Sequence, residues 1–184
     1  MERLVGTSIE KYGTIDILMN NAGILGPIKP FTEYTEEDYD EVLNINLKGA
    51  FFLMNKIIPL MVEKGQGKII NVSSVSILGE RYIAAYCASK GGLNSLTKTL
   101  TLEYADKGIN INAICPGAVD TEMMRDIDQQ YPGVIDAIVS RTPSGRMASA
   151  DDIAFAALYL ASEESNFVNG LSLFVDGSIM NNVW

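Results

Sequence analysis

The chain has 184 residues, of which 47% are hydrophobic, as is typical of a globular protein with a large core and not of a disordered one. Its net charge of −9 and the lack of any dense basic run argue against nucleic acid and anionic membranes as partners. The absence of histidine excludes Ser-His-Asp hydrolysis, Cys-His proteolysis and His-ligated metal sites, and we expect no metal.

The chain carries no sign of secretion or membrane insertion. Cys87 and Cys115 are too few for a disulfide framework, and we interpret both as small buried residues in a reducing compartment. Residues 1–4 lack the apolar core of a signal peptide, and the apolar stretch 50–62 is interrupted and too short to span a bilayer. We therefore expect a soluble, cytoplasmic protein.

The first elements in chain order are a helix and a buried strand. The opening residues place apolar side chains at near-helical spacing and stop at Gly13, which suits a helix C-terminus. Residues 15–19 form an apolar run and predict a strand, and the NNAG sequence at 20–23 predicts a tight loop. Residues 24–34, with their prolines and glycine, are expected to be irregular.

A long helix and a second strand follow. Thr35 is the expected start of this helix, because three acidic residues come directly after it and favour the positive end of the helix dipole. The apolar stripe predicts that the helix continues, with a bend, toward residue 62. Residues 68–72 are β-branched and predict a strand that leads into Ser73 and Ser74.

The second half repeats this alternation. The expected elements are a helix over 84–106, a strand over 109–114, a helix over 151–161 and a last strand over 171–175. Ser149 is placed to cap the third of these elements. Residues 118–148 are polar, weakly periodic and punctuated by proline and glycine, so we expect them to be irregular.

This order of elements predicts an α/β fold. Alternating strands and helices are typical of a doubly wound parallel sheet covered by helices on both faces, which gives three layers. The strands are near-continuous apolar runs, as burial on both faces requires. No repeat or interdomain linker is evident, so we expect residues 1–184 to belong to a single domain.

The chemistry is concentrated in a few polar residues near strand ends. Tyr86 and Lys90 lie four apart and so share one face of the expected helix 84–106. Alone, the pair is as easily a surface tyrosine beside a solvated lysine. Its significance comes from polar residues elsewhere in the chain, namely NNAG at 20–23, Asn46, Ser74 and PGAVDT at 116–121.

In this order and combination, the motifs resemble those of the short-chain dehydrogenase/reductase family, from about residue 2 to residue 177. The resemblance implies a Rossmann-like fold and an NAD(P)-dependent oxidoreductase that interconverts an alcohol and a ketone or aldehyde by hydride transfer. It also implies a homo-oligomer, a dimer or tetramer built from the helices 36–62 and 84–106. Ala84, Ala88 and Gly92 form a small-residue stripe on the second helix that would suit either a partner helix or the cofactor.

The resemblance also assigns roles to residues. Tyr86 would be the catalytic acid/base and Lys90 its partner, with Ser74 holding the substrate oxygen and Asn46 supporting a proton relay. Ser73 remains open, because the gap from Ser74 to Tyr86 is one residue shorter than the commonest in the family. The expected contacts of NAD or NADP are Asn20, Ala22, Gly23, Tyr86, Lys90, Pro116, Gly117, Val119 and Thr121.

The expected reaction needs a proton donor as well as a hydride donor. Hydride arriving at a carbonyl carbon leaves an alkoxide, which must be protonated as it forms. A phenol with a pKa near 10 is a reluctant proton shuttle at neutral pH, and a nearby cation such as Lys90 is expected to lower that pKa. Two of the motifs have a simpler structural interpretation. The NNAG sequence and the Pro116-Gly117 pair could each be only a turn.

The chain departs from the family at its start. The Gly-rich turn that holds the cofactor pyrophosphate, three strands with their helices and the residue that selects NAD or NADP are not found, so about four strands are expected. The strand 15–19 is therefore expected to be an exposed edge and an association hazard. We also expect the chain alone to bind cofactor poorly and its activity to be doubtful.

The sequence leaves two functional hypotheses open. The first is the NAD(P)-dependent oxidoreductase, which the retained Ser74, Tyr86 and Lys90 favour. The second is a shortened, non-catalytic interaction or scaffold protein, for which decay of these residues would be the sign, and no decay is seen. Residues 122–148, where the family places its substrate lid, suggest a moderately apolar alcohol or ketone as substrate.

Overall fold

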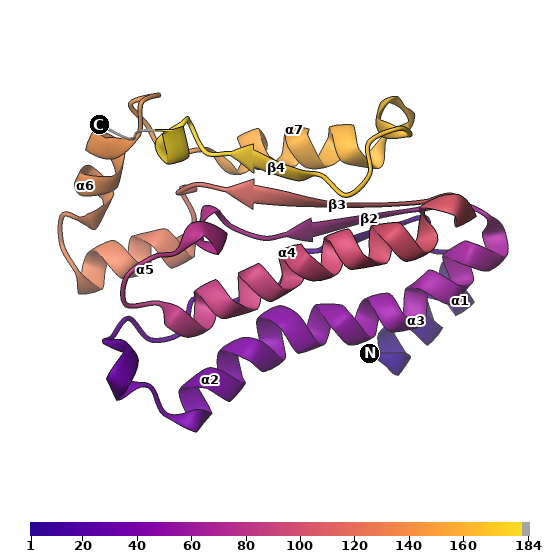
Figure 1. The fold of residues 1–184 in the computed structure, drawn as a ribbon, viewed down its shortest axis with the longest axis horizontal. Coiled ribbons are helices and arrows are strands. Elements are labelled where there is room, and N and C mark those ends of the chain that lie inside the picture. Colours follow the sequence, from indigo (N-terminus) through magenta and orange to yellow (C-terminus); the bar gives the residue numbers. More distant parts are fainter. Residues whose placement is uncertain (182–184) are drawn as a thin grey trace.

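The computed structural model of the chain describes residues 1–181 and is built on a four-stranded parallel sheet (Figure 1). The strands are β1 (Ile17–Asn20), β2 (Gly67–Val72), β3 (Ile109–Pro116) and β4 (Ser172–Val175), in the order β1-β2-β3-β4. Each strand lies within two residues of its expected range, so the predicted parallel α/β fold with four strands is confirmed.

Helices cover both faces of this sheet and give it three layers (Figure 1). On one face lie α3 (Gly49–Lys64) and α4 (Ala84–Tyr104), and α1 (Glu2–Tyr12) packs beside α3. On the other face lies α7 (Ala150–Ala161). Neighbouring residues of β2 show the division, because Ile69 packs toward α3 and Ile70 toward α7.

Local capping explains where several helices begin and end. The Thr35 hydroxyl accepts the Asp38 amide at the start of α2 (Glu36–Leu43), and Ser149 caps α7 in the same way through Asp152. Gly13 ends α1 with φ of 78°, a left-handed conformation that glycine adopts without strain. All three boundaries agree with the expectations from sequence.

The helices differ from the expectations at two places. The helix expected from Thr35 toward residue 62 is confirmed as the run Glu36–Lys64, and its expected bend is a π-helical segment, Asn44–Lys48, which lies between α2 and α3 and changes the hydrogen-bond register. The segment 118–148 is not irregular, because it contains α5 (Glu122–Gln130) and α6 (Val134–Arg141).

The short 3-10 turns are η1 (Phe31–Glu33), η3 (Val75–Leu78), η4 (Ala105–Lys107), η5 (Glu163–Ser165) and η6 (Ile179–Asn181).

Two surface features follow from this arrangement. The strand β1 lies at one edge of the sheet, as expected, and its Ile17 and Met19 side chains are exposed. The helical run Glu36–Lys64 is long and apolar enough to cross a membrane by length and composition alone. Its Met54 and Met61 side chains are buried against the sheet, which is typical of a core helix in a globular protein.

Candidate active site

Three parallel strands end at the same edge of the sheet and bring the predicted site residues together there. Asn20 ends β1, Ser73 and Ser74 follow β2, and Gly117 follows β3. The N-terminal part of α4, which carries Tyr86, lies at this same end (Figure 1). Crevices outside the carboxyl ends of parallel strands are where open α/β sheets bind their ligands.

Tyr86 and Lys90 lie side by side, one turn apart on α4. The Lys90 ammonium is 5.6 Å from the centre of the Tyr86 ring, and it donates a 2.8 Å hydrogen bond to the carbonyl of Val72. Lys90 is 4% exposed, so it is not the solvated surface lysine of the simpler interpretation. Its bond to Val72 ties α4 to the carboxyl end of β2.

Burial changes the acid/base properties of both groups. Burial lowers the pKa of the Lys90 ammonium to about 8, because the charged form loses its hydration. Burial raises the pKa of Tyr86, and a hydrogen bond with Ser74 offsets part of this rise. The expected lowering of the Tyr86 pKa by Lys90 is therefore not found. Tyr86 keeps its proton at neutral pH, which is the state that a proton donor requires.

The two serines after β2 face different neighbours. The Ser74 hydroxyl lies close enough to Tyr86 to lower its pKa, and the Ser74 oxygen lies 2.9 Å from that of Ser76. The Ser73 hydroxyl instead donates to the backbone carbonyl of Lys90 at 3.1 Å. The geometry thus favours Ser74 over Ser73 for contact with a reacting oxygen. The buried Ser76 is part of this group and was missed from the sequence.

Asn46 joins the loop after β1 to the catalytic helix. Its amide oxygen accepts the Ile24 backbone N–H at 2.8 Å, and its amide nitrogen donates to the Ile24 carbonyl at 2.8 Å and to the Ser89 hydroxyl at 3.1 Å. Ser89 in turn donates to the Tyr86 carbonyl at 2.7 Å. The π-helical segment presents Asn46 at this junction, in keeping with the frequent occurrence of such bulges at functional sites.

A second polar chain runs through the interior beneath the site. The Asn20 side chain donates to that of Asn71 at 2.8 Å, and the Asn71 amide donates to the Thr97 hydroxyl at 2.8 Å. These bonds connect β1, β2 and α4. Asn20 therefore positions the strand end through its side chain. Asn71 was missed from the sequence, where an asparagine inside a β-branched strand was the available signal.

The loop after β3 is held by close packing. A β-carbon on Gly117 would lie 3.0 Å from the Asp176 α-carbon, so a larger residue there would crowd the segment after β4. Val119 forms a parallel bridge with Ala148 through the backbone groups on either side of it. The Thr121 hydroxyl caps α5 by accepting the Met124 amide at 3.4 Å. The expected cofactor contacts of Val119 and Thr121 stay predictions.

The shape of the site fits a nicotinamide cofactor at one point in particular. A β-carbon on Gly23 would lie 3.2 Å from the Asn46 amide oxygen and 3.3 Å from the Lys90 ammonium. A side chain at this position would crowd both groups, so glycine allows the loop after β1 to approach the buried ammonium closely. Ala22, just before it, is exposed. Within residues 1–181, no cluster of carboxylate and cysteine side chains is arranged to hold a metal ion.

Comparisons with known proteins agree with this geometry. A family profile described as enoyl-(acyl carrier protein) reductase matches residues 1–179. The chain is 37% identical over 181 residues to a 3-oxoacyl-[acyl-carrier-protein] reductase of Thermotoga maritima, covering 98% of this chain and 72% of that protein. It is 40% identical over 178 residues to galactitol 2-dehydrogenase of Agrobacterium fabrum, covering 91% and 69%.

A solved structure extends the likeness to three dimensions. The gluconate 5-dehydrogenase of Burkholderia cenocepacia, in complex with NADP and tartrate, superposes with a TM-score of 0.92 at 37% identity. The superposition covers 98% of this chain and 70% of that one.

Proposed function

The chain belongs to the short-chain dehydrogenase/reductase family, and we propose that Tyr86, Lys90, Ser74 and Asn46 carry its reaction. The protein is an NAD(P)-dependent oxidoreductase that interconverts an alcohol and a ketone or aldehyde. The observation that carries the residue assignment is the buried Lys90 next to the partly buried Tyr86, beside Val72 and Ser74 at the strand ends. The relatives are named as oxidoreductases, and nothing favours a non-catalytic scaffold.

The cofactor is proposed to bind with its nicotinamide end against this pair. When bound, it supplies or accepts the hydride. The groups proposed to hold it are the Lys90 ammonium, the backbone at Ala22 and Gly23, and the loop from Pro116 through Gly117 and Val119 to Thr121. Asn20 contributes by fixing the end of β1. This choice is supported by the close approach of the Gly23 backbone to Asn46 and Lys90 at the carboxyl ends of the strands.

Tyr86 is proposed to give its proton to the substrate oxygen during reduction. Ser74, which lies beside the Tyr86 phenol, holds that oxygen. In the oxidative direction the Tyr86 phenolate takes the alcohol proton and becomes the phenol, and the nearby Lys90 ammonium stabilises the phenolate before this transfer. A positioned proton transfer of this kind contributes about 10² to 10⁴ in rate.

Asn46 is proposed to support the exchange of protons with solvent. It lies between the Ile24 backbone and Ser89, and Ser89 contacts Tyr86. Its rigid placement within the π-helical segment favours a positioning role for the loop and the helix together. The Lys90 ammonium, with its pKa of about 8, provides a titratable group on the same side.

We further propose that the protein is cytoplasmic, that residues 1–184 belong to one domain, and that it forms homo-oligomers. The single sheet shared by all four strands supports the second point. Exposed aromatic side chains on α2 and α3 support the third, among them Phe51 and Phe52. The stripe on α4 gives weaker support, because Gly92 faces Leu47 of the same chain, 2.8 Å from where a β-carbon would lie.

The test of this function is the Tyr86→Phe variant, made in a form of the protein that carries the family's Gly-rich cofactor-binding segment. We expect at least about a hundredfold loss of NADH- or NADPH-dependent carbonyl reduction with little change in cofactor affinity, because only the transferred proton is removed. Tyr104→Phe, at the other end of α4, is the matched control and should keep its turnover. A Tyr86→Phe protein that retains half of its activity would refute the assignment.

A further inference from the structure

A cleft lies beside the catalytic groups, between the loop after β1 and the lid helix α5. Its volume is about 480 Å³, within the range of small-molecule sites. Residues 24–28 form one wall, and this wall begins at Ile24, which is bound to Asn46. The other wall is α5, which starts directly after the β3 loop. The cleft therefore adjoins the site where a substrate carbonyl would react.

The two walls differ in chemistry. The loop wall is apolar and offers Ile24, Leu25, Pro27 and Ile28. The α5 wall is mixed. Met123, Ile127 and Tyr131 line it beside Gln130 and two carboxylates, Glu122 and Asp126, which lie four residues apart and so on one side of the helix. Carboxylate and amide oxygens accept hydrogen bonds from hydroxyl groups, and the apolar wall suits a carbon skeleton.

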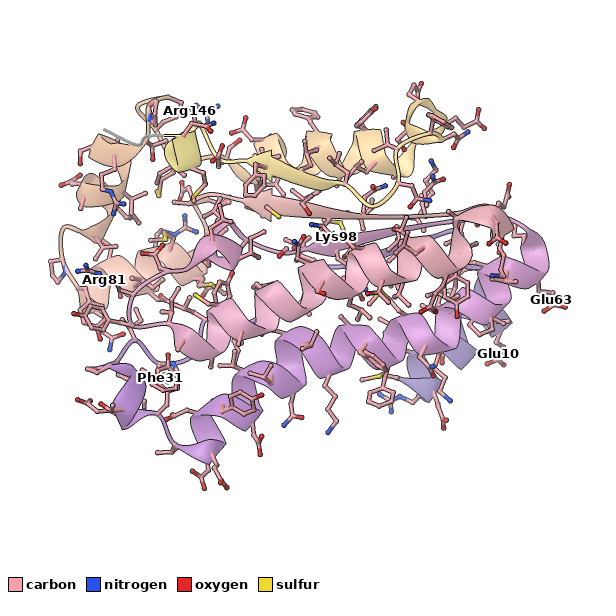
Figure 2. The ribbon with its side chains drawn as sticks, in the orientation of Figure 1. Glu10, Phe31, Glu63, Arg81, Lys98 and Arg146 are labelled. Atoms are coloured by element: carbon pink, nitrogen blue, oxygen red, sulfur yellow. The ribbon has the colours of Figure 1, made fainter. Side chains whose placement is uncertain are left out.

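Positive charge is absent from this lining. Among the described residues, none of those that line the cleft is a lysine or an arginine. The cations next to it in sequence are engaged elsewhere, Lys29 with Asp38 and Arg125 with Asp120. Arg81, in the segment that leads into α4 (Figure 2), does not line the cleft. Lys90 does not line the cleft either. Its ammonium lies against Gly23 and donates a hydrogen bond to the Val72 carbonyl.

We infer that this cleft selects an uncharged ketone or alcohol and disfavours substrates that carry a carboxylate or a phosphate. The inference rests on the proposed function and adds the charge class of its substrate. An anionic group in the cleft would meet Glu122 and Asp126 without a cation to offset them. Their repulsion would weaken anion binding by about tenfold, the scale of a partly exposed charge pair.

The test compares amides with the acids that they match in shape. We propose pyruvamide with pyruvate, acetoacetamide with acetoacetate, and levulinamide with levulinate. The protein should reduce each amide with a kcat/KM about tenfold above that of its acid. In the Glu122→Gln/Asp126→Asn variant this preference should fall to about threefold or less, whereas the Asp151→Asn/Glu163→Gln variant, altered on the opposite side of the sheet, should keep it.

A binding measurement separates this inference from the function on which it rests. Ligand-observed NMR with the same pairs reports occupancy of the cleft whether or not turnover follows. Preferred binding of the amides without any reduction would contradict the proposed function and support the inference. Reduction of acids and amides with equal efficiency, a preference unchanged in Glu122→Gln/Asp126→Asn, or binding of neither member would overturn the inference.

Discussion

Lys90 is a buried charged side chain, and its burial makes the free energy of unfolding depend on pH. Its pKa of about 8 in the folded protein lies below the ordinary value of 10.5, so between these pH values the unfolded chain binds more protons. The free energy of unfolding should therefore rise with pH across this window. Below pH 8 both states are charged, and the folded state bears the cost of a buried ammonium.

The variant Lys90→Met isolates this contribution. From pH 7 to pH 10, the free energy of unfolding of the native protein should rise by about 2 kcal/mol relative to that of the variant. Urea unfolding of both proteins at the two pH values measures the difference. The other titrating groups are shared by both proteins and cancel to first order. A difference that stays constant with pH would mean that Lys90 is solvated in the folded state.

At the scale of residues, the sequence located the centre of the site better than its surroundings. Tyr86 and Lys90 are identified by their place in an ordered series of motifs, and they do meet beside Val72. Asn71 and Ser76 were not anticipated, because their importance comes from neighbours far apart in the chain or from burial. The direction of the Tyr86 pKa shift was also missed, since burial cannot be read from spacing.

The loop 24–34 is fastened to the start of α4 by one side chain. The Tyr34 hydroxyl donates to the carbonyls of Pro27 at 2.7 Å and Tyr82 at 3.1 Å, and the Lys29 N–H also donates to the Tyr82 carbonyl, at 2.8 Å. Tyr82 has φ of 68°, an unfavourable conformation for a residue with a bulky side chain. The wall of the substrate cleft is thus held against the helix that carries Tyr86.

The variant Tyr34→Phe should release this contact. We expect a loss of about 1 kcal/mol in the free energy of unfolding, because the part-buried carbonyl of Pro27 loses its donor. The substrate KM should rise severalfold while kcat changes less, since the wall moves and the proton donor stays. Tyr39→Phe, an exposed tyrosine on α2, is the control for both measurements. Equal behaviour of the two variants would show that Tyr34 does not position the loop.

At the scale of elements, periodicity found the buried elements and missed the exposed ones. The strands and α4 have strong apolar patterns and good boundary residues, so they were predicted within two residues. The helices α5 and α6 are short and contain no fully buried residue, so their pattern is weak in a polar segment. The π-helical segment is invisible to the same method, because a one-residue change of register hardly alters the apolar stripe.

The whole molecule exposes apolar surface that suggests assembly. Phe51 and Phe52 on α3 are each more than 40% exposed, and their rings contact each other edge to face. We expect light scattering to report a dimer or tetramer at micromolar concentration, and Phe51→Asp/Phe52→Asp to shift it toward monomer. A clean monomer, or dissociation caused instead by Phe155→Asp on α7, would contradict an interface built on α2, α3 and α4.

The overall fold could be predicted because the separate features of the sequence all indicate the same structure. Apolar strands, capped helices and the strand-end motifs all indicate one doubly wound sheet, and this consistency is what specifies a single structure. The substrate cleft could not be predicted from the sequence in this way. Its shape depends on how α5 packs against residues 24–28, two segments about a hundred residues apart.

The central claim is hydride transfer to a carbonyl carbon with a proton from Tyr86. The most direct test uses a nicotinamide cofactor that carries deuterium at the transferred position and follows the label by mass spectrometry. Acetoacetamide reduced by the native protein should gain one deuterium at the new alcohol carbon, and Tyr86→Phe should form the labelled product at least about a hundred times more slowly. An alcohol formed without the label, or labelled equally fast by Tyr86→Phe, would contradict the claim.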